Sequence, residues 1–156
     1  FLYVGLMIKN EKPYLIEFNV RMGDPECQTI LPLLENDLSE IFFDCCVGKL
    51  SEKKIKLSNK KSICIVLCSK GYPEDYKKDS EISKLNKLSL KDNEYIYHAG
   101  TKLKDNKILN SGGRVLNFVS TSNNLKESRN DLIKLIKKLD WENGFFRKDI
   151  AYKVID

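Results

Sequence analysis

The sequence lacks any apolar run that approaches the roughly 20 residues needed to cross a lipid bilayer. Its amino terminus also lacks the basic region, apolar core and cleavage site of a secretory signal. These absences argue against a membrane-spanning helix and against a signal peptide. They favour a cytoplasmic protein that has no membrane partner.

The five cysteines show no CxxC motif and no Cys/His pattern, and their number is odd. A disulfide framework or a zinc site would normally show one of these patterns. We therefore expect reduced thiols, buried in apolar segments. The cysteines are Cys27, Cys45, Cys46, Cys64 and Cys68.

An arginine-rich block is also absent, although the net charge is +5 from 27 basic and 22 acidic residues. The lysines form scattered pairs beside polar or acidic residues, which is typical of solvated surfaces. A nucleic-acid site would gather basic residues with aromatic ones. We expect no nucleic-acid partner, and net charge alone supports the alternative of a basic, non-enzymatic binding module.

What is present is an ordinary globular composition, with 42% apolar and 31% charged residues in 156. This length suits one compact domain, or the edge of one domain followed by a small second domain. The chain opens at Phe1 directly into a strand-like segment. We therefore expect it to be part of a longer protein.

The first third predicts a hairpin followed by two short helices. The strands are expected at Leu2–Ile8 and Tyr14–Val20, with a polar turn between them. Asp24 is a candidate N-cap for a helix that begins at Pro25 and is interrupted at Pro32. A second helix should follow the cap Asn36-Asp37 and end at Gly48, and both helices should pack on the hairpin.

A polar, lysine-rich segment, Ser51–Lys61, marks the expected domain boundary. The remainder predicts a small antiparallel sheet crossed by one helix, which is capped by Ser122 or Asn123. The fold class is therefore α+β. Strands are expected at Ser62–Ser69, Glu94–Ala99, Lys107–Asn110 and Arg114–Ser120, and the apolar stripe of the helix at Leu125, Leu132, Ile133, Ile136 and Leu139.

Three polar residues alternate along the second strand of the hairpin. Glu17, Asn19 and Arg21 should project from one face, since successive strand side chains point to opposite sides. Carboxylate and amide oxygens suit Mg²⁺, and a guanidinium suits a phosphate. The simpler alternative is a solvent-exposed polar face. On either reading, the intervening residues Ile16, Phe18 and Val20 should face a core.

The segment Ile16–Gln28, IEFNVRMGDPECQ, closely resembles the signature of the phosphoribosylamine–glycine ligases, also called glycinamide ribonucleotide synthetases. Met22 departs from it, because the family typically has an aromatic residue there. The adenine pocket and the phosphate-covering loop of the family have no counterpart. Further matching segments follow in the family's order: FLYVGLMI, GYP, HAGTKL, SGGRVL and FRKDI.

The resemblance implies the C-terminal edge of an ATP-grasp domain in residues 1–55 and a small C-terminal α+β domain in residues 62–156. It implies an ATP-dependent ligase of purine synthesis that joins 5-phosphoribosylamine and glycine through glycyl phosphate. The products would be glycinamide ribonucleotide, ADP and phosphate. The partners would be glycine, 5-phosphoribosylamine, ATP with Mg²⁺ or Mn²⁺, and a missing N-terminal part, without which the chain should be inactive.

By the same resemblance, Glu17 and Asn19 match the metal ligands that hold Mg-ATP, and Arg21 is the candidate catalytic residue that stabilises the transferring phosphoryl group. Asp24 stays open between an N-cap and a substrate contact, whereas Glu26 fits a helix-stabilising role. His98 stays open between a structural and a proton-transfer role. Candidates for the phosphoribosylamine side are His98, Gly100, Thr101, Gly112, Gly113 and Arg114.

A second enzymatic alternative is another ATP-grasp carboxylate–amine ligase or a biotin-dependent carboxylase, because the pattern ExNxR recurs in those families. The continuation Gly23–Glu26 and the segment His98–Thr101 argue against both.

Overall fold

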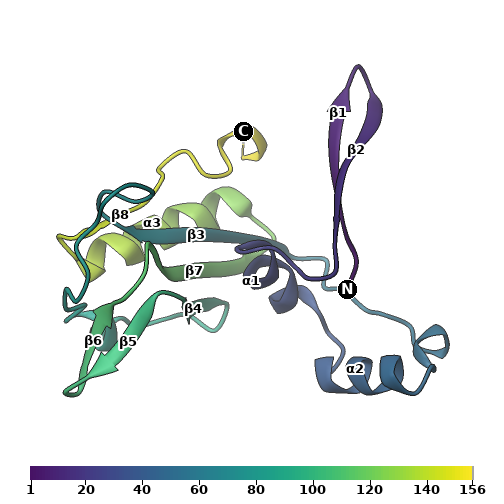
Figure 1. The fold of residues 1–156 in the computed structure, drawn as a ribbon, viewed down its shortest axis with the longest axis horizontal. Helices are drawn as coiled ribbons and strands as arrows, with labels where there is room; N and C mark the ends of the chain where they lie inside the picture. Colours follow the sequence, from purple (N-terminus) through teal and green to yellow (C-terminus); the bar gives the residue numbers. More distant parts are fainter. Residues whose placement is uncertain (156) are drawn as a thin grey trace.

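The structure, a computed structural model, describes residues 1–155 and contains helices and antiparallel sheets, which confirms the α+β class. A four-stranded sheet is accompanied by two separate hairpins (Figure 1). The strands are β1 (Tyr3–Lys9), β2 (Lys12–Asn19), β3 (Lys61–Ser69), β4 (Glu94–His98), β5 (Thr101–Lys104), β6 (Lys107–Asn110), β7 (Arg114–Ser122) and β8 (Gly144–Phe145). The α-helices are α1 (Glu26–Ile30), α2 (Leu38–Cys46) and α3 (Leu125–Leu139), and 3-10 turns occupy Leu31–Leu33, Leu50–Glu52, Leu85–Lys87 and Tyr152–Val154.

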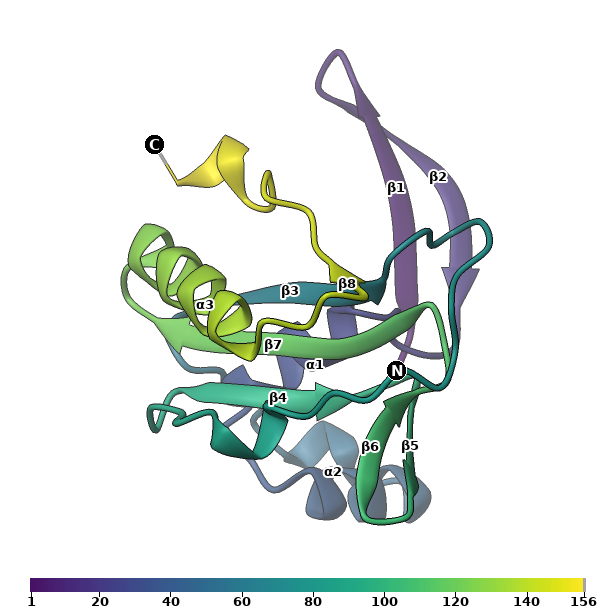
Figure 2. The ribbon, with the colours of Figure 1, turned by 90° about the vertical axis from the view of Figure 1, so that its left-hand side faces the viewer.

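The main hydrophobic core lies between the four-stranded sheet and α3. The sheet has the order β4-β7-β3-β8, and all its pairings are antiparallel. Alternate residues of β3, Ile63, Ile65 and Leu67, are buried in this core, and Phe118 of β7 is fully buried there as well. Figure 2 shows α3 lying across this face of the sheet. The predicted sheet with a crossing helix is therefore confirmed.

Helix α3 differs from the prediction at its start. The side chain of Asn124 accepts a hydrogen bond from the backbone N–H of Glu127 (3.1 Å), so Asn124 is the N-cap, not Ser122 or Asn123. The helix ends at Leu139, and the C-cap residue Asp140 has a left-handed φ of 48°. Its buried side chains are Ser128, Leu132, Leu135, Ile136 and Leu139, of which Ser128 and Leu135 were not in the predicted stripe. Leu125 and Ile133 of that stripe are only partly buried.

Helix α1 packs against β3 and β7 on the opposite face of the sheet (Figure 2). This corrects the expectation that it would pack on the hairpin. Helix α2 is capped as predicted, because the Asp37 carboxylate accepts from the backbone N–H groups of Ser39 (2.8 Å) and Glu40 (3.2 Å). Within α2 only Ile41 is buried.

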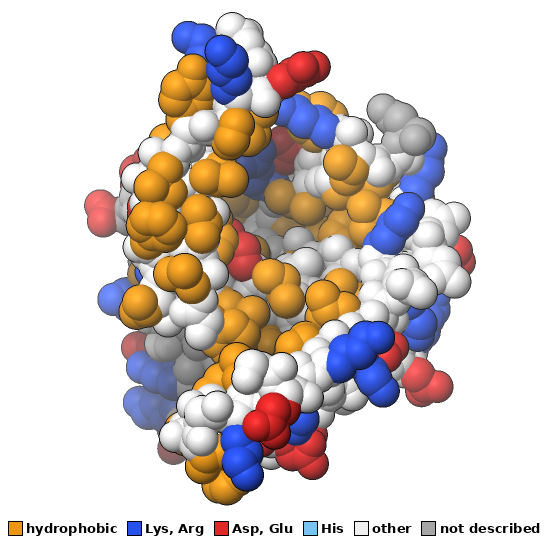
Figure 3. Space-filling view, turned by 90° about the vertical axis from the view of Figure 1, so that its right-hand side faces the viewer, with side chains coloured by type: hydrophobic (Ala, Val, Ile, Leu, Met, Phe, Trp, Pro, Cys, Tyr) orange, Lys and Arg blue, Asp and Glu red, His pale blue; other side chains and the backbone are white. Residues whose placement is uncertain are grey.

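The β1–β2 hairpin stands away from the sheet (Figure 1). Its turn consists of Asn10 and Glu11, both with positive φ, as in a type I′ turn. The prediction that Ile16, Phe18 and Val20 face a core is wrong within the described residues, because they are 63%, 60% and 86% exposed. Figure 3 shows hydrophobic side chains gathered on one face of the molecule, beside and within a hollow.

The predicted boundary segment is tied to the residues before α2. Leu34 and Leu57 form an isolated antiparallel bridge, and the backbone N–H of Lys56 donates to the Asn36 side chain (2.6 Å). Lys61, expected to end this segment, is already the first residue of β3. No helix in residues 1–155 is long and apolar enough to cross a membrane.

All five cysteines are free, but the expectation that they are buried is wrong for Cys45 and Cys46. Cys45 and Cys46 are exposed on α2, since most of that helix lies outside the core. Cys27, Cys64 and Cys68 are half-buried.

This difference predicts a clear order of alkylation. We expect iodoacetamide at mildly alkaline pH to modify Cys45 and Cys46 first and Cys64 last. The thiolate is the reacting species, and burial raises the pKa of Cys64 to about 12. Time-resolved peptide mass spectrometry measures the order. Equal rates at Cys64 and Cys45 would show that the face of β3 that carries Cys64, opposite to the α3 core, is open to solvent.

Candidate functional site

The two predicted metal ligands lie on the same face of β2. In the β1–β2 ladder Glu17 pairs with Gly5 and Asn19 pairs with Tyr3. A bulge leaves Ile16 without a ladder partner just before Glu17. Because Glu17 and Asn19 both follow the bulge, their alternation is intact and their side chains project together.

Because Gly5 has no side chain, it leaves room for the Glu17 side chain beside it. A Cβ atom at position 5 would lie 3.0 Å from Glu17 Cγ. The carboxylate and the Asn19 amide oxygen are hard ligands of the kind that Mg²⁺ and Mn²⁺ prefer, so these residues fit a divalent metal. In residues 1–155 no three His, Cys, Asp or Glu side chains gather closely enough to hold a metal ion. Glu17 and Asn19 would therefore form part of a coordination shell.

Arg21 does not share the strand geometry. Strand β2 ends at Asn19, and Arg21 lies in the bend that follows, so strand alternation no longer aligns it with Glu17. Its Nη1 donates to the carbonyl oxygen of Met22 (3.1 Å), and the residue is exposed. The guanidinium is close in sequence to the metal ligands and open to solvent.

Asp24 does not cap α1, which corrects one of its two predicted roles. The helix begins at Glu26, and Pro25 occupies the cap position without a side-chain hydrogen bond. One carboxylate oxygen of Asp24 accepts from Gln28 Nε2 (2.8 Å), and the other lies 3.2 Å from Arg114 Nε. Asp24 therefore joins the segment after the hairpin to the start of β7.

Glu26 lies in the first turn of α1, as its predicted helix-stabilising role requires. Its carboxylate fills the space beside Gly23, where a Cβ atom would lie 2.0 Å from Glu26 Oε2. A side chain at position 23 would therefore displace the exposed Glu26 carboxylate.

Two glycine loops, residues 98–101 and 111–114, meet at one end of the sheet, where β4 ends and β7 begins. The carbonyl oxygen of Gly100 accepts from the N–H groups of Ser111 (2.7 Å) and Gly112 (3.2 Å), while the Gly100 N–H donates to the Arg114 carbonyl (2.8 Å). A Cβ atom on Gly100 would lie 2.6 Å from both Gly112 Cα and the Arg114 carbonyl oxygen. Glycine at position 100 is what permits this approach.

The other predicted residues of the glycine loops lie around this contact. His98 Nδ1 is 2.9 Å from Thr101 Oγ1, and His98 is exposed. Gly113 lies against the ring of Tyr72, where a Cβ atom would overlap the ring carbons. The structure therefore brings together Asp24, Gly100, Gly112, Gly113 and Arg114, with His98 and Thr101 beside them.

Arg114 also affects the nearby thiol of Cys68. Burial raises the pKa of Cys68, and the positive charge of Arg114 offsets part of that rise, while Asp24 adds to it. The Arg114 side chain is 45% exposed. It is therefore accessible to an anion from solvent while Asp24 holds its Nε.

Sequence reasoning missed two residues beneath the glycine loops. Ser69 and Asn110 are 1% and 0% exposed, and the Ser69 hydroxyl donates to the carbonyl oxygen of Gly112 (2.8 Å). The sequence offered one signal for them: each is a polar residue at the end of a strand, Ser69 in β3 and Asn110 in β6.

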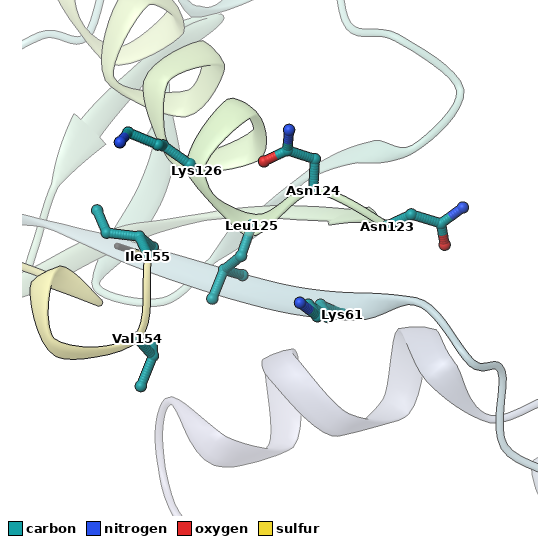
Figure 4. A pocket seen from close by; sticks show the side chains of 7 residues that line it. All are labelled: Lys61, Asn123, Asn124, Leu125, Lys126, Val154 and Ile155. Atoms are coloured by element: carbon teal, nitrogen blue, oxygen red, sulfur yellow. The ribbon is translucent and has the colours of Figure 1, made fainter.

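A polar pocket of about 310 Å³ lies at the opposite end of β3 and β7 (Figure 4). It is lined by Lys61 at the start of β3, by residues at the start of α3, and by Val154 and Ile155. The lysines Lys61 and Lys126 come from different elements there. None of the residues that line this pocket belongs to the predicted site.

Two family models match the chain in sequence. The model described as "Phosphoribosylglycinamide synthetase, C domain" matches residues 62–153, and "Phosphoribosylglycinamide synthetase, ATP-grasp (A) domain" matches residues 1–27. The first match covers more than half of the chain. The second covers the hairpin with Glu17 and Asn19.

Individual proteins agree with these matches. A phosphoribosylamine–glycine ligase of Caldanaerobacter subterraneus is 45% identical over 150 residues, which cover 96% of this chain and 35% of that protein. A chloroplastic phosphoribosylamine–glycine ligase of Arabidopsis thaliana is 37% identical over 99% of this chain and 30% of its own length. The crystal structure of the ligase from Thermotoga maritima superposes with a TM-score of 0.72 at 31% identity, covering 95% of this chain and 36% of that one. The chain thus spans about a third of these relatives.

Proposed function

The chain belongs to the phosphoribosylglycinamide synthetase family, and we propose that it forms the metal-binding edge and the C domain of a phosphoribosylamine–glycine ligase. The complete enzyme would join glycine to 5-phosphoribosylamine with ATP, in purine synthesis. The single observation that carries this proposal is the order of the two family matches, at residues 1–27 and 62–153 of one continuous chain. We place the division between the two parts at residues 55–62.

The metal-binding edge would hold the polyphosphate of ATP. Glu17 and Asn19 would bind Mg²⁺ or Mn²⁺ from one face of β2, since they present a carboxylate and an amide oxygen together. When bound, the metal neutralises negative charge on the transferring phosphoryl group. Arg21 is exposed immediately beyond the strand, and its guanidinium is suited to orient that group by hydrogen bonds.

The glycine loops would hold the phosphoribosylamine. Glycine residues allow backbone N–H groups to approach a phosphate, and Arg114 adds a positive charge beside them. Asp24 links the two halves of the site, because its ion pair with Arg114 connects the segment after the metal strand to the loop. Thr101 and His98 lie at the same end of the sheet, where the sugar hydroxyls would reach them.

The rest of the ATP-grasp domain would cover the hairpin. Both faces of the hairpin carry exposed large apolar side chains, Leu6 (53%) and Phe18 (60%) on one face and Met7 (58%) on the face of Glu17. An exposed apolar surface of this kind marks an interface. We therefore place nucleotide binding largely in residues outside this chain, and we propose a cytoplasmic location for the ligase.

Reconstitution tests the proposed function. We expect no ADP formation from this chain alone, and ADP formation that depends on both glycine and 5-phosphoribosylamine once the N-terminal part of the same ligase is supplied. A coupled ADP assay measures this. The control is the N-terminal part alone, which should also be inactive.

The same assay separates the other candidate functions. ADP formation that depends on bicarbonate would favour a carboxylase, and dependence on a different carboxylate or amine would favour another ATP-grasp ligase. Micromolar, steeply salt-dependent binding to RNA, without ligase activity in the reconstituted protein, would favour the basic binding module.

A further inference from the structure

A chain of buried hydrogen bonds ends at the loop 111–114. Asn110 Nδ2 donates to Ser69 Oγ (2.9 Å), and the Ser69 hydroxyl donates to the carbonyl oxygen of Gly112 (2.8 Å). The backbone N–H of Ser69 donates to the next carbonyl, that of Gly113 (2.7 Å). A single serine at the end of β3 therefore fixes two consecutive peptide groups of the loop.

Asn110 is itself held on both sides of its amide. Its Nδ2 also donates to the carbonyl oxygen of Lys77 (2.6 Å), and its Oδ1 accepts from the backbone N–H of Ser80 (2.7 Å). These bonds assign the orientation of the amide and leave it no free rotation. In a fully satisfied buried network, each member restrains the next.

Two residues that follow α3 also hydrogen-bond to this network, through Ser80. The hydroxyl oxygen of Ser80 accepts from Trp141 Nε1 (3.2 Å) and from Asn143 Nδ2 (2.8 Å). The network therefore runs from the residues after α3, through Ser80, Asn110 and Ser69, to the glycine loop.

The geometry of the peptide group gives this network a consequence for ligand binding. In a planar trans peptide, the N–H points opposite to the preceding carbonyl. Because the carbonyls of Gly112 and Gly113 point toward Ser69, the N–H groups of Gly113 and Arg114 must point away from it. The orientation of these donors is thus set by Ser69, and that of Ser69 by Asn110.

We propose that Ser69 and Asn110 are positioning residues, which fix the loop 111–114 so that it binds the phosphate of 5-phosphoribosylamine. This proposal rests on the proposed function. Neither side chain needs to touch the substrate, since both act through the backbone of the loop. The ligand recognised is a sugar phosphate monoester.

The test compares Ser69→Ala with Ser128→Ala in the complete ligase. Ser128 is a matched control, because it is also buried (3% exposed) and hydrogen-bonded to serine hydroxyls, but it lies on α3 near the opposite end of β7. We expect Ser69→Ala to raise the KM for 5-phosphoribosylamine about tenfold, with the KM values for ATP and glycine within about twofold of the wild type. Ser128→Ala should leave all three KM values within about twofold.

A second readout does not depend on the reaction. In NMR spectra of the 156-residue chain, the amide signals of Gly112, Gly113 and Arg114 should shift in Ser69→Ala and stay in place in Ser128→Ala. If the wild-type ligase makes no ADP with glycine and 5-phosphoribosylamine, the proposed function fails. The amide signals then still decide whether Ser69 sets the conformation of the loop.

Three results would overturn the inference. These are an unchanged KM for 5-phosphoribosylamine in Ser69→Ala, an equal rise of all three KM values, and the same rise in both serine variants. If Ser69→Ala does not fold, Ser69→Cys replaces it, since a thiol is only somewhat larger than the hydroxyl, fills the site and is a weaker donor. The same selective rise in KM, at a smaller size, is then expected, and its absence counts against the inference.

Discussion

Glu17→Ala is expected to lower the kcat/KM of the complete ligase for ATP by about a hundredfold to a thousandfold. Glu17 is the only carboxylate of the proposed pair, so without it only the neutral Asn19 oxygen of the pair would hold the metal that neutralises the polyphosphate. Loss of one group that stabilises charge in a transition state costs about a hundredfold to a thousandfold. Steady-state ADP formation with saturating glycine and 5-phosphoribosylamine measures the effect.

The control for Glu17 is on the same hairpin. Glu11→Asn removes a carboxylate from the turn, where φ is 61° and asparagine is well tolerated, and should leave activity within about twofold of the wild type. Glu17 is exposed, so Glu17→Ala should also leave the thermal midpoint of unfolding nearly unchanged. Activity within about tenfold of the wild type in Glu17→Ala would refute the metal assignment.

Features that depend on local sequence were predictable. The hairpin, β3, β6 and α3 were predicted within about two residues, because apolar periodicity and turn residues act over short distances. The common face of Glu17 and Asn19 followed from strand alternation alone. Strand β8 has only two residues, Gly144–Phe145, which is too short to show any periodicity.

Features that depend on distant residues were not predictable. Asp24 has the residue type and the position of an N-cap, yet its carboxylate is engaged by Arg114, which lies far along the chain. The hairpin has the pattern of a buried strand pair, but burial depends on what covers it. The serine of β3 beneath the glycine loop is an ordinary strand-end residue until β7 is placed beside it.

The contact between the glycine loops leads to the second large prediction. Gly100→Ala is expected to lower the free energy of unfolding by about 3 kcal/mol, because the new Cβ atom would lie 2.6 Å from Gly112 Cα and from the Arg114 carbonyl oxygen. Both neighbours are backbone atoms, so no side-chain rotation relieves the overlap. Urea denaturation of the 156-residue chain measures the change.

Gly48→Ala separates this contact from the general cost of replacing glycine. Gly48 has a φ of 73°, and a Cβ atom there would meet no other atom within 4 Å, so its substitution should cost only about 1 kcal/mol of backbone strain. Equal costs at the two positions would mean that the loops 98–101 and 111–114 separate easily. A larger cost at Gly100, together with a raised KM for 5-phosphoribosylamine in the complete ligase, would mean that the close approach of the two loops builds the phosphate end of the site.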